Sequence, residues 1–202
     1  MSRVFSQKHK SDREYSGSNV FFKVAGKGDA TVCGQAASPL ANRRLARCAT
    51  IDEIVVATTT NEADDQIEQL CTNNQVACFR GSENDVLGRI CAMLESFGAQ
   101  VHAEFYGDSP LLDSDLVDHS VNVFLNNKGI DLLTNTLERT YPSGLEINVY
   151  SAYRLIELDR EMPPDATMRE HVCANLKLRP SRYNILNFTA PVEHCGLIFI
   201  WN

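Results

Sequence analysis

The sequence lacks the features of several large protein classes. It has no apolar run near the roughly 20 residues that a membrane span needs, and its first 18 residues are too polar for the apolar core of a signal peptide. Basic residues are scarce, because 19 Lys and Arg stand against 26 Asp and Glu, a net charge of −7. That balance argues against a broad grip on a nucleic-acid backbone. We therefore expect no membrane and no nucleic-acid partner.

Cysteine is present, but without the spacing of a metal or disulfide site. The chain has 7 cysteines in 202 residues, and no two of them form a C-x-x-C pair. A zinc site and a disulfide framework are therefore not expected, and free thiols in a reducing cytoplasm fit this usage best. No G-x-G-x-x-G follows a strand either, which argues against a dinucleotide-binding oxidoreductase.

What the chain does have is an alternation of strand and helix patterns through its middle. Short apolar runs rich in strand-forming residues alternate with segments that place apolar residues on one helical face. This alternation predicts an α/β fold in which helices cover a mostly parallel sheet. The expected strands are 52–60, 75–81, 101–107 and 130–136, and the expected helices are 61–74, 82–98 and 113–127.

The sequence on either side of this middle region predicts further elements. A first strand is expected at 21–24, and residues 1–18 are expected to be a disordered tail. We expect residues 19–202 to form a single domain, since no repeat or linker interrupts them. The segments expected after the middle are an extended run at 144–151, helices around 152–160 and 165–177, and a strand-like run at 183–188.

Capping residues predict where the helices begin and end. Asn61 is the expected N-cap of the first helix, and Ser82 that of the second, with Asp85 reaching back to it. Gly98 is expected to end the second helix. The apolar faces expected to be buried are Ala63, Ile67, Leu70 and Cys71 on the first helix, and Val86, Ile90, Met93 and Leu94 on the second.

The stretch "YGDSPLLDSDLVD", residues 106–118, places two carboxylates where a strand passes into a helix. Ligands of open α/β sheets collect beyond the carboxyl ends of the strands. Asp108 at such an end can hold a divalent cation beside nucleotide phosphates, because Mg²⁺ prefers oxygen ligands. The alternative for Asp108 is a plain strand-to-helix turn. Asp113 is expected to be a helix N-cap.

Five motifs occur in the order and spacing seen in sugar cytidylyltransferases. They are "IDEIVVATTTNEADDQIEQLC", "CFRGSENDVLGR", "YGDSPLLDSDLVD", "RTYPSGLEINVYS" and "REHV", and they run from about Arg44 to about Glu193. The chain resembles the group of the spore coat polysaccharide biosynthesis protein F, which is related to CMP-Kdo and acylneuraminate cytidylyltransferases.

The resemblance implies a Rossmann-like nucleotide-diphospho-sugar transferase fold. It also implies an enzyme that uses Mg²⁺ and CTP to make a CMP-sugar and pyrophosphate for a surface polysaccharide or glycan. The expected partners are CTP and a sugar or sugar acid, with a homodimer left open. On the nucleotide side, the family's metal-binding Asp corresponds to Asp108, and the residues that match the nucleotide pocket are Thr58, Thr59, Arg80, Asp85 and Arg89.

On the sugar side, the resemblance assigns two segments. Arg139 is the expected catalytic cation, although a solvated loop arginine is the alternative. The other matching residues are Tyr141, Glu146, Arg169, Glu170 and His171. Glu146 stands where family members often carry Asp, and His171 is equally well explained as a capping or interface residue.

The two ends of the chain depart from the family pattern. The family's Gly-rich triphosphate loop has no convincing counterpart, and Gly26, Lys27 and Gly28 are the nearest candidates. A later Asp that completes the family's metal site is also missing. Motifs lost at both ends suggest a frameshifted or truncated gene, so we expect the fold to survive and catalysis to be impaired. The alternative is a catalytically degenerate relative that binds nucleotide or serves as a partner subunit.

Overall fold

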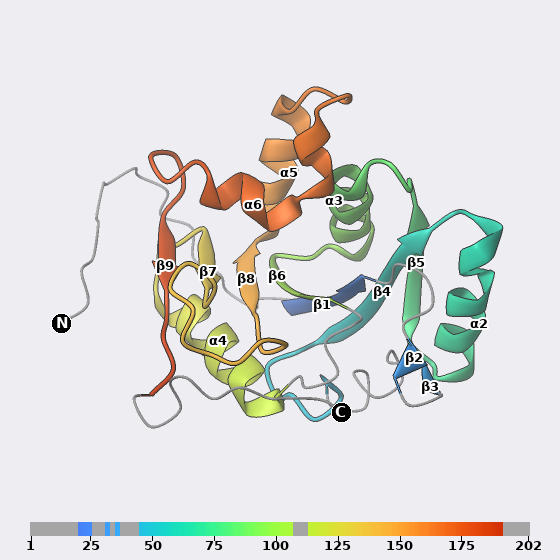
Figure 1. Ribbon diagram of the computed structural model, residues 1–202, viewed down its shortest axis with the longest axis horizontal. Coiled ribbons are helices and arrows are strands. Elements are labelled where there is room, and N and C mark those ends of the chain that lie inside the picture. The colour runs from blue at the N-terminus through green and yellow to red at the C-terminus, as the bar shows by residue number, and fades with distance from the viewer. Residues whose placement is uncertain (1–19, 26–30, 33–34, 37–44, 107–112, 192–202) are drawn as a thin grey trace.

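A computed structural model describes residues 20–25, 31–32, 35–36, 45–106 and 113–191 (Figure 1). Its centre is a seven-stranded sheet with the strand order β5-β4-β1-β6-β8-β7-β9. The short strands β2 (Thr31–Val32) and β3 (Gln35–Ala36) pair separately. The strands of the large sheet are β1 (Val20–Ala25), β4 (Glu53–Thr59), β5 (Ala77–Gly81), β6 (Val101–Tyr106), β7 (Leu132–Thr134), β8 (Asn148–Ser151) and β9 (Ile185–Asn187).

The sheet is mostly parallel, as the sequence predicts. Strands β5, β4, β1 and β6 run parallel to one another, and β9 runs parallel to β7. Strand β8 is antiparallel to both β6 and β7. The loop 135–147, which contains no helix, joins β7 to β8, and crossovers between parallel strands usually contain one.

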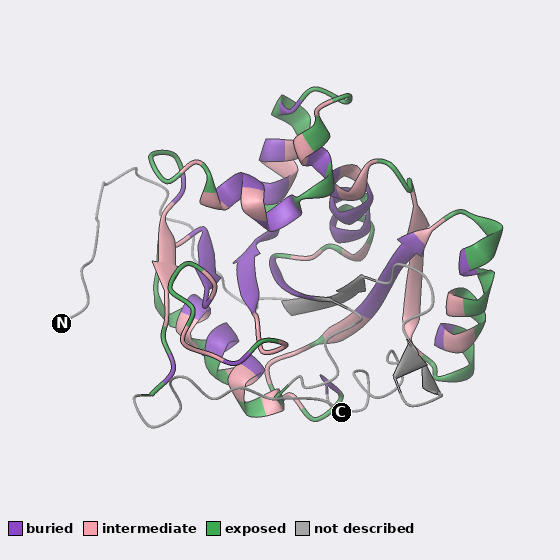
Figure 2. Ribbon diagram, in the orientation of Figure 1, coloured by how far each residue is buried: buried purple, intermediate pink, exposed green. Residues whose placement is uncertain are grey.

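Helices cover both faces of the sheet (Figures 1 and 2). Residues of α3, α5 and α6 share one buried apolar cluster with β4 and β8, and residues of α2 and α4 share a second cluster with the other face. Strand β4 shows why: Val55 and Ala57 belong to the first cluster, and Val56 between them belongs to the second. The helices are α2 (Asp65–Asn73), α3 (Val86–Phe97), α4 (Ser114–Asn126), α5 (Ala152–Glu161) and α6 (Val172–Lys177), with short 3-10 turns η1 (Glu62–Asp64) and η2 (Thr167–Glu170).

The order of the strands positions the candidate site. From β1 the chain passes outward to β4 and β5, and then returns to β6 on the other side of β1. Such a reversal leaves a crevice at the carboxyl ends of the central strands. Thr59 and Gly81 end β4 and β5 at this edge. The turns that follow β1 and β6, with Gly26, Lys27, Gly28 and Asp108, lie outside the described residues.

Two helix starts differ from the sequence prediction. Helix α3 begins at Val86, and its N-cap is Asp85, whose carboxylate accepts a hydrogen bond from the Gly88 N–H at 2.8 Å. Ser82 instead accepts from the Asp85 N–H at 3.1 Å, so it supports the turn before the cap. Asn61 precedes the short turn η1 and makes no side-chain capping bond.

Among the remaining helix predictions, two helix ends are confirmed, and one helix and parts of the apolar faces differ. Gly98 ends α3 with φ 66°, in the left-handed region that favours glycine. Asp113 caps α4, accepting from the N–H groups of Asp115 and Leu116 at 2.9 and 3.0 Å. The helix expected over 165–177 is divided into η2 and α6. The predicted faces are buried except at exposed Ala63 and half-buried Ile67, Leu70 and Val86.

No helix of the described residues is long and apolar enough to cross a membrane.

Candidate functional site

The carboxyl end of β4 is organised by a carboxylate that the sequence analysis did not single out. Asp64 is 7% exposed and accepts from the hydroxyls of Thr58 and Thr59 at 2.7 and 2.5 Å, and from the Thr59 N–H at 2.9 Å. Burial alone would raise the pKa of Asp64, but these hydrogen bonds and the charge of Arg80 hold the pKa below its ordinary value. Thr58 and Thr59 are therefore held in one arrangement at the ligand-binding edge.

Arg80 fastens the loop that follows β4 to strand β5. Its guanidinium donates to the carbonyls of Thr59 and Asn61 at 2.9 and 2.7 Å. It also pairs with Asp65 at 2.6 Å and Glu68 at 2.8 Å on α2. The structure therefore gives Arg80 a positioning role at the edge, and its expected contact with a nucleotide stays a prediction.

Arg89 points inward from α3 and is 5% exposed. One guanidinium nitrogen donates to the Ser82 carbonyl at 2.6 Å, and the buried Nε has no hydrogen-bond partner among the described residues. Burial lowers the pKa of Arg89, against the opposing pull of the Asp64 and Asp85 charges. Gly81 makes room for it, because an added Cβ there would lie 2.7 Å from the Arg89 Cγ.

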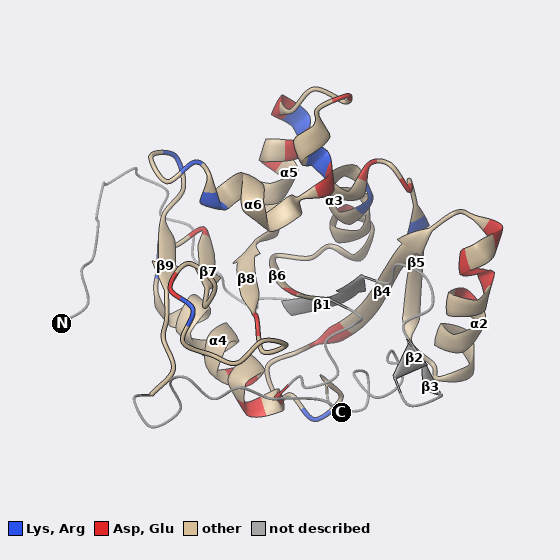
Figure 3. Cartoon of the chain, viewed as in Figure 1, with Lys and Arg blue, Asp and Glu red and all other residues tan. Residues whose placement is uncertain are grey.

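Asp85 and Arg169 form a partly buried ion pair, although the sequence analysis assigned them to different substrates. Acidic and basic positions both occur along the chain around α5 (Figure 3). The Arg169 Nε and Nη2 donate to the two carboxylate oxygens of Asp85, each at 2.8 Å. Arg169 also pairs with Asp159 and donates to the Met162 carbonyl at 3.1 Å. Burial would raise the pKa of Asp85, but the bonds from Arg169 and Gly88 outweigh it and hold the pKa low. The pair joins the start of α3 to the segment before α6.

The neighbours of Arg169 in the "REHV" motif face outward. Glu170 and His171 are both exposed, and His171 lies between η2 and α6. The structure therefore separates the three matching residues, with Arg169 directed into the protein and the other two toward solvent. Their expected contact with a sugar stays a prediction.

The loop between β7 and β8 carries the other sugar-side residues. Arg139 and Glu146 lie 3.6 Å apart in an ion pair, and the Arg139 side chain is 71% exposed. Glu146 also accepts from the Gly144 N–H at 2.7 Å. Tyr141 packs edge-on against Phe188, with ring centroids 5.6 Å apart. The loop thus presents an exposed cation that is paired with a hydrogen-bonded carboxylate, and its expected contact with a sugar stays a prediction.

The structure therefore gathers the predicted residues into two groups on either side of β1 and β6. One group is the β4, β5 and α3 edge, and the other is the β7–β8 loop. Asp108 follows β6 in the sequence and lies outside the described residues. The described residues hold no cluster of three or more His, Cys, Asp or Glu side chains that could bind a metal ion. The magnesium site stays a prediction.

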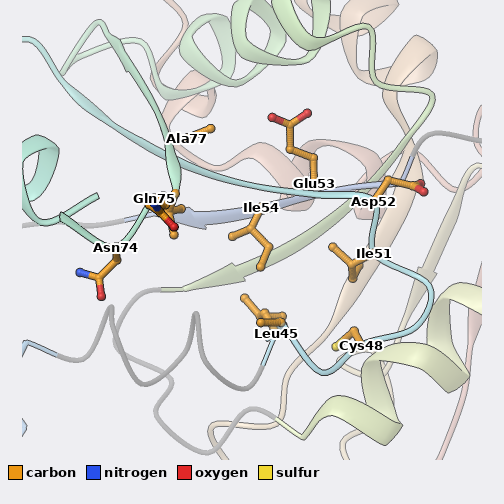
Figure 4. A pocket seen from close by; sticks show the side chains of 11 residues that line it. Leu45, Cys48, Ile51, Asp52, Glu53, Ile54, Asn74, Gln75 and Ala77 are labelled. Atoms are coloured by element: carbon orange, nitrogen blue, oxygen red, sulfur yellow. The ribbon is translucent and has the colours of Figure 1, made fainter. Parts of the chain in front are cut away.

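A pocket of about 480 Å³ lies at the other edge of the sheet (Figure 4). Its lining includes Glu53 and Ala77, the first residues of β4 and β5, and Leu45 and Ile54. Because ligands of this architecture bind beyond the carboxyl ends of the strands, the pocket is not part of the candidate site.

Polar residues inside apolar strands were a signal that the sequence analysis did not use. Glu104 lies in the run "VHAEFY" and is 2% exposed, and Asn148 in β8 is 3% exposed. Both face the cluster beneath α6, at neighbouring positions of β6 and β8. A buried polar side chain must be satisfied, so such residues near a strand's ligand-binding end are candidates for a site.

Comparison with known proteins agrees with this architecture. A family model described as cytidylyltransferase matches residues 40–193. The spore coat polysaccharide biosynthesis protein SpsF of Bacillus subtilis is 30% identical over 140 residues, which are 69% of this chain and 57% of SpsF. The chain thus spans little more than half the length of that relative.

Solved structures extend the likeness to the fold. A cytidylyltransferase from Leptospira borgpetersenii superposes with a TM-score of 0.76 at 25% identity, covering 86% of this chain and 76% of its own. A CMP:2-keto-3-deoxy-manno-octonic acid synthetase complexed with CTP shares the fold, with a TM-score of 0.62 at 13% identity over 87% of this chain and 90% of its own. These proteins share the nucleotide-diphospho-sugar transferase fold seen here. With the family model matching most of its length, the chain belongs to the cytidylyltransferase family.

Proposed function

We propose that this chain transfers CMP from CTP to a sugar or sugar acid and releases pyrophosphate, in the synthesis of a surface polysaccharide or glycan. Family membership supports the nucleotide and the reaction. The name of the SpsF relative supports the polysaccharide role, although the chain spans 57% of that protein. We propose the cytoplasm as the compartment, because the five described cysteines are free thiols.

The observation that carries this proposal is the buried Arg89 guanidinium, which makes no ion pair with the described residues. Arginine stays charged in proteins, and a buried charge is costly unless an opposite charge or hydrogen bonds compensate it. The described part of the chain places no carboxylate within ion-pair distance of Arg89, and its Nε is unsatisfied. An anionic nucleotide at this edge would supply the missing partner.

The reaction joins the two groups of residues. A hydroxyl oxygen of the sugar attacks the α-phosphorus of CTP, a new O–P bond forms, and the bond to the bridging oxygen breaks as pyrophosphate leaves. The hydroxyl proton is released to solvent. Positioning and charge neutralisation supply most of the rate. Arg89 would hold the nucleotide from α3, and Arg139 would offset charge from the β7–β8 loop.

The proposal includes a magnesium ion that Asp108 would bind. When bound, the ion would neutralise charge on the triphosphate. The described residues neither supply nor exclude its ligands, so this part is tested through Asp108 itself.

The experiment compares melting temperatures with CTP, ATP, GTP and UTP, and then pyrophosphate release with a panel of sugars and sugar acids. CTP with Mg²⁺ should stabilise the protein most. Arg89→Met should keep an unliganded stability within about 1 kcal/mol of wild type, because it removes one hydrogen bond together with an uncompensated buried charge. It should lose the CTP shift.

Arg160→Met is the matched control, because Arg160 is 70% exposed and pairs with Glu95 on the surface. A full CTP shift in Arg89→Met would remove the main support for the proposal. A CTP shift without pyrophosphate release for any acceptor would favour the non-catalytic nucleotide-binding or partner-subunit alternative.

A further inference from the structure

A polar row crosses the sheet near the ligand-binding edge, on the face that α6 covers. Glu104 of β6 lies opposite Asn148 of β8, and Asn148 lies opposite Thr134 of β7. All three are at most 3% exposed. One step nearer the amino end of β7 the same face is apolar, because Leu132 and Tyr150 belong to the buried cluster there. This face of the sheet therefore changes from apolar to polar at the row, which we call the polar floor.

Hydrogen bonds extend this floor to a cation. The Thr134 hydroxyl donates to the Asn148 side-chain oxygen at 2.7 Å and lies 3.0 Å from the Thr136 hydroxyl. Lys177, the last residue of α6, donates from its Nζ to the Thr136 hydroxyl at 2.5 Å. Lys177 thus reaches across to the carboxyl end of β7, although a lysine at this position could have stayed on the carbonyls of its own helix.

Lys177 differs from the structural cations of the chain. Arg154 pairs with Asp131 and Glu157, and Arg169 with Asp85 and Asp159. No carboxylate of the described residues lies within 4.0 Å of the Lys177 ammonium, which is half-buried. The neighbouring thiol of Cys173 does not supply the charge, because burial raises its pKa to about 12 even though Lys177 acts to lower it.

The position of this cation corresponds to the acceptor half of the site. Strands β7 and β8 lie on the far side of β6 from the Arg89 group. Strand β8 lies between β6 and β7, so β7 is about 10 Å from β6, because neighbouring strands are about 4.8 Å apart. Of the three N–H donors of the ammonium, Thr136 and the Cys173 thiol take two, which leaves one for an anion.

The geometry points to Lys177 as a specificity-determining residue that binds the anionic group of the acceptor sugar, a carboxylate or a phosphate. This inference rests on the proposed function, because it takes the group at β7 to be the acceptor half of a CMP-transfer site. In this inference Thr134, Thr136 and Asn148 hold the Lys177 ammonium in place through their hydrogen bonds. Neutral sugars should be poor acceptors.

The test separates the charge of Lys177 from its hydrogen bond. Lys177→Gln keeps a donor for Thr136 and loses the charge, and Lys177→Arg keeps both. The acceptors are N-acetylneuraminate and 2-keto-3-deoxy-manno-octonate as sugar acids, glucose 1-phosphate as a sugar phosphate, and N-acetylglucosamine as a neutral sugar. Lys128→Gln, an exposed lysine before the other end of β7, is the matched control.

We expect Lys177→Gln to raise the KM of an anionic acceptor on the order of tenfold while leaving the KM of CTP unchanged. Lys177→Arg should recover most of the loss, and Lys128→Gln should behave as wild type. The acceptor that shows this response identifies the anion as carboxylate or phosphate. An unchanged acceptor KM in Lys177→Gln, or a preference for the neutral sugar, would overturn the inference and leave the proposed function standing.

The absence of pyrophosphate release with every acceptor would instead defeat the proposed function. Isothermal titration calorimetry with the same four compounds then tests whether Lys177 binds the anionic group of the sugar. Binding of an anionic sugar that Lys177→Gln loses and Lys177→Arg keeps would support the inference. Binding that is equal in all variants, or absent from wild type, would overturn it.

Discussion

Removal of the Arg169 guanidinium should be among the most damaging single changes to this fold. Arg169 is 6% exposed and contributes two 2.8 Å bonds to Asp85, a pairing with Asp159 and a bond to the Met162 carbonyl. Arg169→Met keeps much of the apolar stem and leaves two partly buried carboxylates without their cation. Removal of one partner of a fully buried pair costs about 3–5 kcal/mol. Because both carboxylates are partly exposed, we expect a cost near the lower end of this range, about 3 kcal/mol.

Asp85→Asn provides an intermediate case. Its amide oxygen can still accept from the Gly88 N–H, and Arg169 keeps Asp159. The expected cost is about 1–3 kcal/mol, the range for a hydrogen bond to a charged group. Arg182→Met is the control, because Arg182 is 39% exposed and pairs with Glu161 near the surface, where a pair contributes at most about 1 kcal/mol.

The assay is urea unfolding followed by circular dichroism, with midpoints compared at equal m-values. The pH dependence provides a second check on Asp85. Because its pKa is lowered in the folded state, the stabilisation is present above the unfolded value of about 3.9 and is lost as pH falls through the folded value. The gap between wild type and Asp85→Asn should be constant above about pH 5 and shrink below about pH 4.

Two results would refute this reasoning about the ion pair. A loss below about 1 kcal/mol in Arg169→Met would place the pair in the class of surface bridges. A gap between wild type and Asp85→Asn that stays constant down to pH 2 would show that the Asp85 charge does not stabilise the fold.

Two further predictions concern the ligand-binding edge. Asp108→Asn should leave the melting temperature nearly unchanged and abolish the Mg²⁺-dependent part of the CTP shift, whereas Asp113→Ala should lose roughly 1 kcal/mol of stability and keep that shift; a full Mg²⁺ response in Asp108→Asn would reduce "GDSP" to a turn. Gly81→Ala should cost about 1–3 kcal/mol, because the new Cβ would meet the Arg89 Cγ at 2.7 Å. A double-mutant cycle with Arg89→Ala should remove most of that cost, and additive effects would show that the clash is not with Arg89.

The residue pattern by itself determined those features that depend on near neighbours along the chain. Apolar periodicity identified β4, β5, β6, α3 and α4, because burial of one face requires a local repeat. Gly98 and Asp113 were identified by chemistry within a few residues, since a left-handed turn and free N–H groups are local demands. The order of the five motifs along the chain can also be read without a structure, and it led to the family that the comparisons show.

Tertiary structure decided what those residues meet. Asp85 and Arg169 are 84 positions apart, and Lys177 and Thr136 are 41 apart, so no periodicity could pair them. The start of α3 shifted from Ser82 to Asp85, whose carboxylate both caps the helix and binds Arg169. The residue pattern alone predicts that Arg89 is a surface charge on its helix, and this prediction is wrong because the folded chain buries it. The sequence shows which side chains are charged. The free-energy cost of burying such a charge, and the group that pairs with it, depend on which distant elements exclude water from it.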